Sequence, residues 1–202
     1  MAGARLILPD GSIQPSIATR LSLRKYLTQQ LLLDRAGIAH RLFGEYWLDV
    51  NSIAEPILVE QTTGACMCCR REAIAQVGPM DESYWMYCED SDYCERFLAR
   101  GWGIAYVPQA TMLHVLGGSS KSARAEMIAA YNLAAARYFA QNHGPLEGFL
   151  ARLIGLLGSS LRLLLWSGAT LATLGRVERF RQQVRLFART VYLTAWPAKR
   201  GR

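Results

Sequence analysis

Residues 83–102 read SYWMYCEDSDYCERFLARGW and decide the fold of the middle of the chain. Counting from Asp90, the apolar residues Cys94, Phe97 and Leu98 follow at positions four, seven and eight. This spacing predicts a helix that ends near the Arg-Gly-Trp turn and carries Asp90 on the same inward face as the apolar residues. A buried carboxylate is costly unless it is paired or used. Asp90 is therefore the leading candidate for a reacting group.

The neighbours of Asp90 leave a second interpretation open. An acid in the first turn of a helix is common, because the helix dipole stabilises it there without any further role. The helical period places Glu89, Asp92 and Arg96 on the opposite side, where we expect solvent contact and an ordinary i,i+4 pair between Asp92 and Arg96. The aromatic stretch before them, Ser83 to Tyr87, is expected to end a strand.

The positive charge of the chain is confined to one end. The 202 residues carry a net charge of +7 and are 51% hydrophobic. Residues 1–143 hold 13 Lys/Arg against 14 Asp/Glu, a net charge of −1, whereas residues 144–202 hold 10 against 2, a net charge of +8. A basic segment of this kind favours nucleic acid or an anionic membrane as partner. Because the segment is also very apolar, the membrane is the stronger expectation.

The five cysteines lie within 29 residues, at Cys66, Cys68, Cys69, Cys88 and Cys94. Their odd number, and the absence of a signal peptide at the start of the sequence, favour reduced thiols in the cytoplasm. The first three lack the CxxC spacing of structural zinc sites, so core thiols are expected in place of a metal cluster.

Turn residues divide the first 145 residues into short elements. The strands are too few for a complete doubly wound sheet, and no glycine-rich phosphate loop is present. The expected elements are a loop or hairpin at Leu8–Ser16, a helix at Leu21–Leu33, a strand at Ile57–Thr62, a short apolar piece at Gly64–Cys69, a helix at Arg71–Val77, strands at Gly103–Val107 and Thr111–Val115, a flexible loop at Gly117–Ser120 and a long helix at Ser122–Asn142.

The C-terminal segment is apolar but interrupted by arginine. Its longest uncharged stretch, Leu163–Gly175, has 13 residues, fewer than the roughly 18 of a membrane-spanning helix. One helical stripe collects the small and basic residues, which are Gly148, Arg152, Gly155, Ser159, Arg162, Trp166, Thr173 and Arg176. A wide apolar face beside a narrow cationic one predicts a helix lying in a membrane interface. Packing on the same domain or a partner chain, and true insertion, are the alternatives.

The following segment has a similar pattern. Phe180, Val184, Phe187 and Val191 form an apolar face with arginines beside it, and the chain closes on Trp196 and the basic run 199–202. Aromatic and basic residues of this kind suit the headgroup level of a membrane. The arginines alternate with Leu and Phe at helical spacing and form no aromatic-basic groove, so no nucleic-acid partner is expected.

Several stretches together resemble the C-terminal half of family-2 glycosyltransferases with the GT-A fold, especially rhamnosyltransferase-like members. They are PDGSIQPS (9–16), RLFGEYW (41–47) and TGACMCCRREAIAQVGPMDESYWMYCEDSDYCERFLARGWGIAYVPQATMLHVLGGSS (63–120). The resemblance covers roughly Leu8 to Pro145. It implies an α/β fold, namely a partial GT-A domain (nucleotide-diphospho-sugar transferase-like) that lacks the N-terminal nucleotide-binding half and is followed by C-terminal amphipathic helices. The corresponding domains are 1–145, the acceptor and catalytic-base half, and 146–202, the membrane-associating tail.

The resemblance also implies roles for the acidic pair and for one histidine. Asp90 matches the general base of these inverting enzymes, which takes the proton from the acceptor hydroxyl. Glu89 would hold the acceptor or orient the base. His114 matches the histidine that completes a divalent-metal site in the family. The alternative is a histidine that simply lies at the end of a strand and binds no metal.

Four further residues match the acceptor side of the family. Gly64 and Ala65 match a turn where a missing side chain lets substrate approach the backbone. Trp85 and Tyr87 would offer flat surfaces to a sugar, with core packing as the alternative. Asp81 and Glu82 match a turn and are expected to be structural.

The chain departs from the family before its first matched stretch. The family begins with a nucleotide-binding region that ends in an Asp-x-Asp-like motif for metal and diphosphate, and Asp10 does not replace that motif. Mg²⁺ or Mn²⁺ is therefore expected only together with a donor half, on a separate chain or in a longer gene product.

Two functions remain open from the sequence. The first is a family-2 inverting glycosyltransferase, truncated or split. It would transfer a sugar from a nucleotide-sugar donor to a lipid-linked or polysaccharide acceptor in cell-envelope glycan synthesis. It would act peripherally at the cytoplasmic face of the membrane, as a homo-oligomer or with a donor-half chain. The second is a non-catalytic membrane-associated binding or assembly module derived from such an enzyme.

Overall fold

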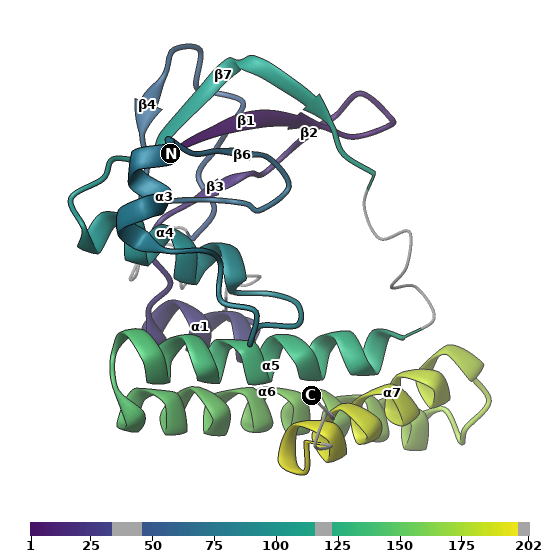
Figure 1. The fold of residues 1–202 in the computed structure, drawn as a ribbon. Helices are drawn as coiled ribbons and strands as arrows, with labels where there is room; N and C mark the ends of the chain where they lie inside the picture. Colours follow the sequence, from purple (N-terminus) through teal and green to yellow (C-terminus); the bar gives the residue numbers. More distant parts are fainter. Residues whose placement is uncertain (34–45, 116–122, 198–202) are drawn as a thin grey trace. The chain divides into compact units, whose positions relative to one another are not determined.

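A computed structural model describes residues 1–33, 46–115 and 123–197 (Figure 1). The contacts divide the chain into two compact units. The sheet unit comprises Met1–Lys25 and Leu42–Gly118, and the helical unit comprises Tyr26–Arg41 and Ser119–Arg202. The expected loop at Gly117–Ser120 and the basic run 199–202 lie outside the described residues. The functional division at residue 145 stays a prediction, although the contacts group the helix before it with the helices after it.

The sheet unit is built around β1, a strand that the sequence analysis did not identify. In the five-stranded sheet the order is β2-β1-β7-β4, with β6 also paired to β1, and a separate pair is formed by β3 and β5. Only β1 and β7 run parallel; the other pairings are antiparallel. The strands are β1 (Ala2–Ile7), β2 (Ile13–Gln14), β3 (Ile17–Ala18), β4 (Ile57–Leu58), β5 (Gln61–Thr62), β6 (Met67–Cys68) and β7 (Ala105–Leu113).

The start of β1 requires glycine at one position. A Cβ added at Gly3 would lie 2.0 Å from Oγ1 of Thr62. The expected hairpin after β1 is confirmed, because β1 and β2 pair around a turn in which the Asp10 carboxylate accepts a hydrogen bond from the Ser12 amide at 3.0 Å. Gly11 has a φ of 83°, which suits the turn.

Four expected strands differ from the structure. Residues 57–62 form two short strands, because Ile57 and Leu58 pair with β7 whereas Gln61 and Thr62 pair with β3. The two strands expected at 103–107 and 111–115 are one strand, β7, with an irregular register between Val107 and Thr111. Pro108 lies in this interval and has no N–H, which interrupts the ladder without ending the strand. Residues 83–87 form no strand, since Tyr87 has a φ of 71°.

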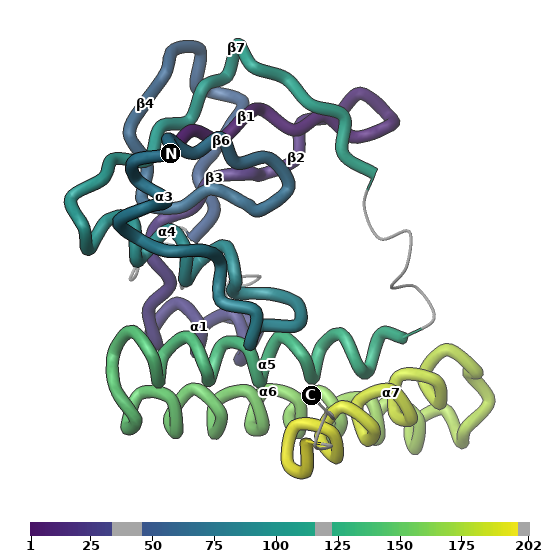
Figure 2. Tube along the Cα trace, in the orientation of Figure 1, coloured from purple at the N-terminus to yellow at the C-terminus, as the bar shows by residue number. Residues whose placement is uncertain are grey.

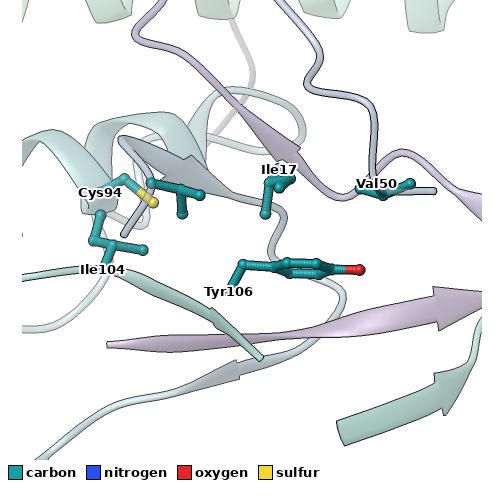
Figure 3. Packing of buried hydrophobic residues seen from close by; sticks show 6 residues of the cluster. Ile17, Val50, Cys94, Ile104 and Tyr106 are labelled. Carbon is teal, nitrogen blue, oxygen red and sulfur yellow. The ribbon is translucent and has the colours of Figure 1, made fainter. Parts of the chain in front are cut away.

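The helices of the sheet unit agree with the sequence analysis. They are α3 (Arg71–Val77) and α4 (Glu89–Ala99). Phe97 of α4 is fully buried with Ala73 of α3 and Tyr93. Figure 3 shows a second cluster of buried residues, in which Cys94 of α4 lies near Ile104, and Ile17 and Tyr106 belong to the same cluster. The apolar spacing that predicted α4 therefore does form its inward face.

The helical unit packs α5 (Arg124–Asn142), α6 (Pro145–Ala172) and α7 (Glu178–Ala195) together with the end of α1 (Leu23–Gln30). Figure 2 shows α5 and α6 running side by side. Asn132 of α5 is buried in this unit. Its Oδ1 accepts a hydrogen bond from the Tyr26 hydroxyl at 3.1 Å, and its Nδ2 donates to the hydroxyls of Ser159 at 3.1 Å and Thr194 at 3.3 Å. This polar contact joins all four helices.

The small and basic stripe of α6 faces inward, where it packs within the helical unit. Gly148, Gly155 and Ser159 are buried. A Cβ added at Gly148 would lie 2.5 Å from Cβ of Ala140. Small residues thus let the backbones of α5 and α6 approach each other. The helical period of the sequence alone could not show whether the apolar face or the small and basic face of α6 is covered.

The apolar face predicted for α7 is turned into the helical unit, which agrees with the packing alternative and not with contact to a membrane. Phe187 is buried, while Arg181, Arg185 and Arg189 beside that face are exposed. Trp196 is also exposed and lies with its ring centroid 5.8 Å from that of Tyr192. α6 is the one described helix that is long and apolar enough to cross a membrane, although 28% of its most apolar window is buried in the unit.

Candidate active site

Asp90 lies in the first turn of α4, where its carboxylate meets backbone donors from two segments. Oδ2 accepts a hydrogen bond from the Gly64 amide at 3.0 Å, and Oδ1 accepts one from the Ser91 amide at 2.7 Å. The Ser91 hydroxyl lies 3.4 Å from Oδ1. Before the helix, Cys88 has a φ of 62°, so the chain enters α4 through a left-handed residue. The side chain of Asp90 is half-buried, and its carboxylate contacts the Gly64 turn, so the burial expected on the inward face is only partial.

Two opposing effects act on the Asp90 carboxyl. Burial raises its pKa, while the hydrogen bonds from Gly64 and Ser91 lower it. Burial is the larger effect, so the pKa of Asp90 is raised above its ordinary value. A carboxylate with a raised pKa is a better proton acceptor, when ionised, than an exposed aspartate. This combination suits a general base.

A polar chain that the sequence analysis missed lies behind Asp90. The Gln61 amide donates to Oγ of Ser91 at 2.7 Å and to the Tyr46 hydroxyl at 2.9 Å. Burial, and then the negative charge of Asp90, raise the pKa of Tyr46, which therefore stays a neutral phenol. A glutamine within an otherwise buried strand was the available signal, because a buried amide requires partners.

Glu89 has a different environment from the solvated one that the helical period suggested. Its side chain is half-buried, and its Oε2 is buried with no hydrogen-bond partner among the described residues. Burial raises the pKa of Glu89, and the charge of Asp90 adds to this. Buried oxygens without a partner are rare in folded proteins, so this one marks Glu89 as a candidate for a role beyond packing.

The four predicted acceptor residues lie on exposed segments around the acids. Gly64 and Ala65 occupy an exposed turn directly before β6. Trp85 and Tyr87 are 56% and 36% exposed, so neither ring belongs to the core. A Cβ added at Gly64 would lie 3.5 Å from Cβ of Asp90, an ordinary contact. The structure therefore brings Gly64 to Asp90 directly, while acceptor binding stays a prediction for all four.

His114 is not part of this group. Its Nδ1 lies 2.8 Å from Oε1 of Gln14, and its backbone follows Leu113, which pairs with Ile7 at one end of β1. β6, which follows Gly64, pairs with Ala2 and Gly3 at the other end. Among residues 1–33, 46–115 and 123–197, no three His, Cys, Asp or Glu side chains are grouped to hold a metal ion. Because Mg²⁺ or Mn²⁺ was expected only together with a donor half, the metal site stays a prediction.

Asp92 and Arg96 form the expected pair but are not on a solvated face. Asp92 is 3% exposed, and its Oδ2 accepts from Nε of Arg96 at 2.8 Å. Arg96 also donates to the carbonyls of Val77 and Pro79 at 3.2 and 3.0 Å. The pair covers the loop between α3 and α4, which the sequence pattern could not show because that loop is not part of the helix.

Comparison with known proteins finds sequence relatives among the rhamnosyltransferases. Two matches, from Mycobacterium tuberculosis strains CDC 1551/Oshkosh and H37Rv, carry the name N-acetylglucosaminyl-diphospho-decaprenol L-rhamnosyltransferase. Each is 32% identical over 144 residues, which is 67% of this chain and 43% of the relative. Rhamnosyltransferase WbbL of Escherichia coli K12 is 32% identical over 72 residues, 36% of this chain and 27% of the relative.

The chain therefore spans less than half the length of these curated relatives. No protein-family model matches it, and no solved structure matches it with significance. The relatives are named as enzymes of the transferase class, and the α/β architecture of the sheet unit is compatible with part of such an enzyme. By its sequence, this chain belongs with the rhamnosyltransferase-like glycosyltransferases.

Proposed function

We propose that this chain supplies the acceptor side and the general base of an inverting family-2 glycosyltransferase with the GT-A fold. The reaction would move rhamnose or a related sugar from a nucleotide-sugar to a lipid-linked or polysaccharide acceptor during cell-envelope glycan synthesis. The observation that carries the proposal is the Asp90 carboxylate, held by the Gly64 and Ser91 amides within a stretch related to rhamnosyltransferases.

The chemistry required of Asp90 is a single proton transfer. The acceptor hydroxyl oxygen forms a bond to the anomeric carbon of the donor sugar while its proton passes to the Asp90 carboxylate. The bond between that carbon and the diphosphate oxygen breaks, and the nucleoside diphosphate leaves with the electron pair. Attack from the face opposite the leaving group inverts the anomeric centre. The Gly64 and Ser91 amides keep the carboxylate aimed throughout, and orientation of this kind accounts for much of catalysis.

The remaining site residues would bind the acceptor. Trp85 and Tyr87 expose their rings on the segment that leads into α4, where a sugar ring can stack. The half-buried carboxylate of Glu89 would hold the acceptor or orient the base. The exposed Gly64–Ala65 turn leaves room at Asp90 for that hydroxyl.

The donor side belongs to the same proposal but not to the described residues. A divalent metal and the nucleotide diphosphate would be bound with a donor-binding region, supplied by a longer gene product or a separate chain. No step above depends on that metal. Because nucleotide-sugars and reduced thiols are found in the cytoplasm, the proposal places the reaction at the cytoplasmic face of the membrane.

The test is a transfer assay with the full chain, membranes, a nucleotide-activated rhamnose and a polyprenyl-diphosphate-linked acceptor, run with and without a supplied donor half. Asp90→Asn should lower the rate about 100- to 10,000-fold, because the amide cannot accept the proton. Asp49→Asn makes the same chemical change at an exposed carboxylate and is the control.

Two results would contradict the proposal. A wild-type rate in Asp90→Asn would remove Asp90 from the role of base. No transfer under any condition, from a chain that still binds the acceptor, would favour the non-catalytic binding module.

A further inference from the structure

The outward face of α6 carries a row of exposed large apolar side chains. We define the α6 ridge as Leu146, Phe149, Leu153, Leu157, Leu164 and Leu171, all of them exposed. Their spacings of three, four or seven residues place them on one stripe along the helix, which is about 40 Å long at about 1.5 Å per residue. Soluble proteins rarely expose an apolar surface this long without a partner.

The two arginines of α6 are turned away from this ridge and satisfied inside the helical unit. Arg152 donates to the carbonyls of Thr194 and Ala195 at 3.3 and 3.0 Å. Arg162 donates to the carbonyls of Gln30 and Gly158 at 2.6 and 2.9 Å. Because both guanidinium groups already have acceptors, the ridge can be buried without desolvating an unpaired charge.

The charge of the same unit favours an anionic lipid surface over a second copy of the chain. Residues 144–202 carry a net charge of +8, and Arg179 and Arg185 of α7 are exposed. Two copies meeting through the same face would bring these charges together, whereas anionic headgroups would neutralise them. Tyr192 and Trp196, exposed at the end of α7, are residue types that prefer the headgroup level.

The packing of α6 decides between lying in the interface and crossing it. The opposite face of α6 is buried against α5 and α7. A spanning α6 would bring Arg124 and Arg137 of α5, and the arginines of α7, into hydrocarbon, where each charge costs about 2.5–3.5 kcal/mol or more. A helix lying flat immerses only one face, to a depth of about 5–10 Å.

We propose that the helical unit docks on anionic membranes with α6 lying in the plane of the interface and the α6 ridge among the acyl chains. In this assignment the apolar face of α6 meets lipid, as the sequence pattern suggested, and the small and basic stripe faces protein. It is also independent of the proposed glycosyl transfer, because lipid binding needs no substrate.

The experiment is flotation of the full chain with vesicles of phosphatidylcholine alone or mixed with phosphatidylglycerol. The wild type should float with the anionic vesicles. Leu164→Glu should reduce its partition at least about tenfold, because one buried leucine contributes about 1.5–3 kcal/mol and tenfold corresponds to about 1.4 kcal/mol. The control is Leu58→Glu in β4, where the leucine is 78% exposed against 70% for Leu164. Its partition should stay within about twofold of the wild type.

Salt and folding measurements complete the test. At about 1 M NaCl, where charges are screened beyond about 3 Å, release should be partial, because the apolar contribution persists; detergent should release the rest. Circular dichroism should show equal helix content in both variants, since both positions are exposed.

Four outcomes would overturn the proposal. They are no flotation of the wild type on anionic vesicles, equal losses in Leu164→Glu and Leu58→Glu, a soluble dimer that Leu164→Glu dissociates, or resistance to alkaline carbonate extraction, which would indicate a spanning helix.

Discussion

At the scale of single residues, the environment of Asp90 balances burial against hydrogen bonding. Burial opposes the ionised form, while the Gly64 and Ser91 donors favour it. Either effect alone would suit catalysis poorly, since an exposed aspartate is a weak base and a buried one without donors would be protonated. The Gln61–Ser91 contact at 2.7 Å holds the serine in place. We therefore regard Gln61 and Tyr46 as positioning residues.

The raised pKa of Asp90 leads to a pH prediction. The base is active when ionised, so activity is lost as the pH falls through the pKa of Asp90. Since that pKa is raised, the acid limb of kcat/KM should lie above the ordinary aspartate value of about 3.9. Ser91→Ala removes a hydroxyl that stabilises the ionised form, so the limb should move to higher pH. Rates measured against pH, in a preparation with its donor half, provide the check.

The matching control is Asp90→Asn. Because asparagine does not titrate, the residual kcat/KM of this variant should not fall at the pH at which Asp90 becomes protonated. If the same limb persists in Asp90→Asn, another residue titrates and the assignment of the base is wrong.

At the scale of elements, α6 owes its position to residues without side chains. The buried glycines allow α5 and α6 to touch along their length, and the carbonyl partners of Arg152 and Arg162 fix its rotation. α4 is fixed differently, by its apolar face and by the buried Asp92–Arg96 pair. Both helices therefore use a charged side chain to contact a neighbouring segment.

Two glycines of α6 offer a matched pair of substitutions. In Gly148→Ala the added Cβ would lie 2.9 Å from the Ala136 carbonyl oxygen, so backbone has to move. We expect a loss of about 1–3 kcal/mol in the free energy of unfolding. In Gly168→Ala the Cβ meets nothing within 4 Å, so helix propensity alone should stabilise the chain by about 0.5–1 kcal/mol.

Denaturant unfolding of the two variants, followed by circular dichroism, measures both changes. Equal effects at the two positions would show that α6 does not pack on α5 through Gly148.

At the scale of the whole molecule, the chain combines a sheet unit with the proposed chemistry and a helical unit with the proposed membrane contact. It matches less than half the length of its rhamnosyltransferase relatives. An activity of the longer proteins is thus divided, in our proposal, between this chain and a donor-binding region.

This division predicts weak binding of the donor to the chain alone. The described residues bring together no three His, Cys, Asp or Glu side chains that could hold a metal ion, and His114 is engaged with Gln14. We therefore expect calorimetry with Mn²⁺ and nucleotide-sugars to show no tight complex, and adding a donor half to create one. A micromolar dissociation constant for the chain alone would mean that the donor site lies within it.

Much of the site was predictable because its signals are local. The four-, seven- and eight-residue spacing after Asp90 identified α4 and its inward face, and turn residues located α3, α5 and the first hairpin. The resemblance to rhamnosyltransferases also rested on consecutive motifs. The Gln61–Ser91–Tyr46 chain was missed, because three residues far apart in sequence carry no common pattern.

The sequence by itself determined which residues share a helix face, where the helices of the sheet unit begin and end, and which family the chain resembles. These follow from the helical period, from turn chemistry and from motif order, all of which act over a few residues. Only the tertiary structure decided that Gly64 binds Asp90, that Asp92 is buried and that α6 covers its glycines while exposing its leucines. Those outcomes depend on which distant segment packs against a face, and a periodic pattern describes the face without describing its neighbour.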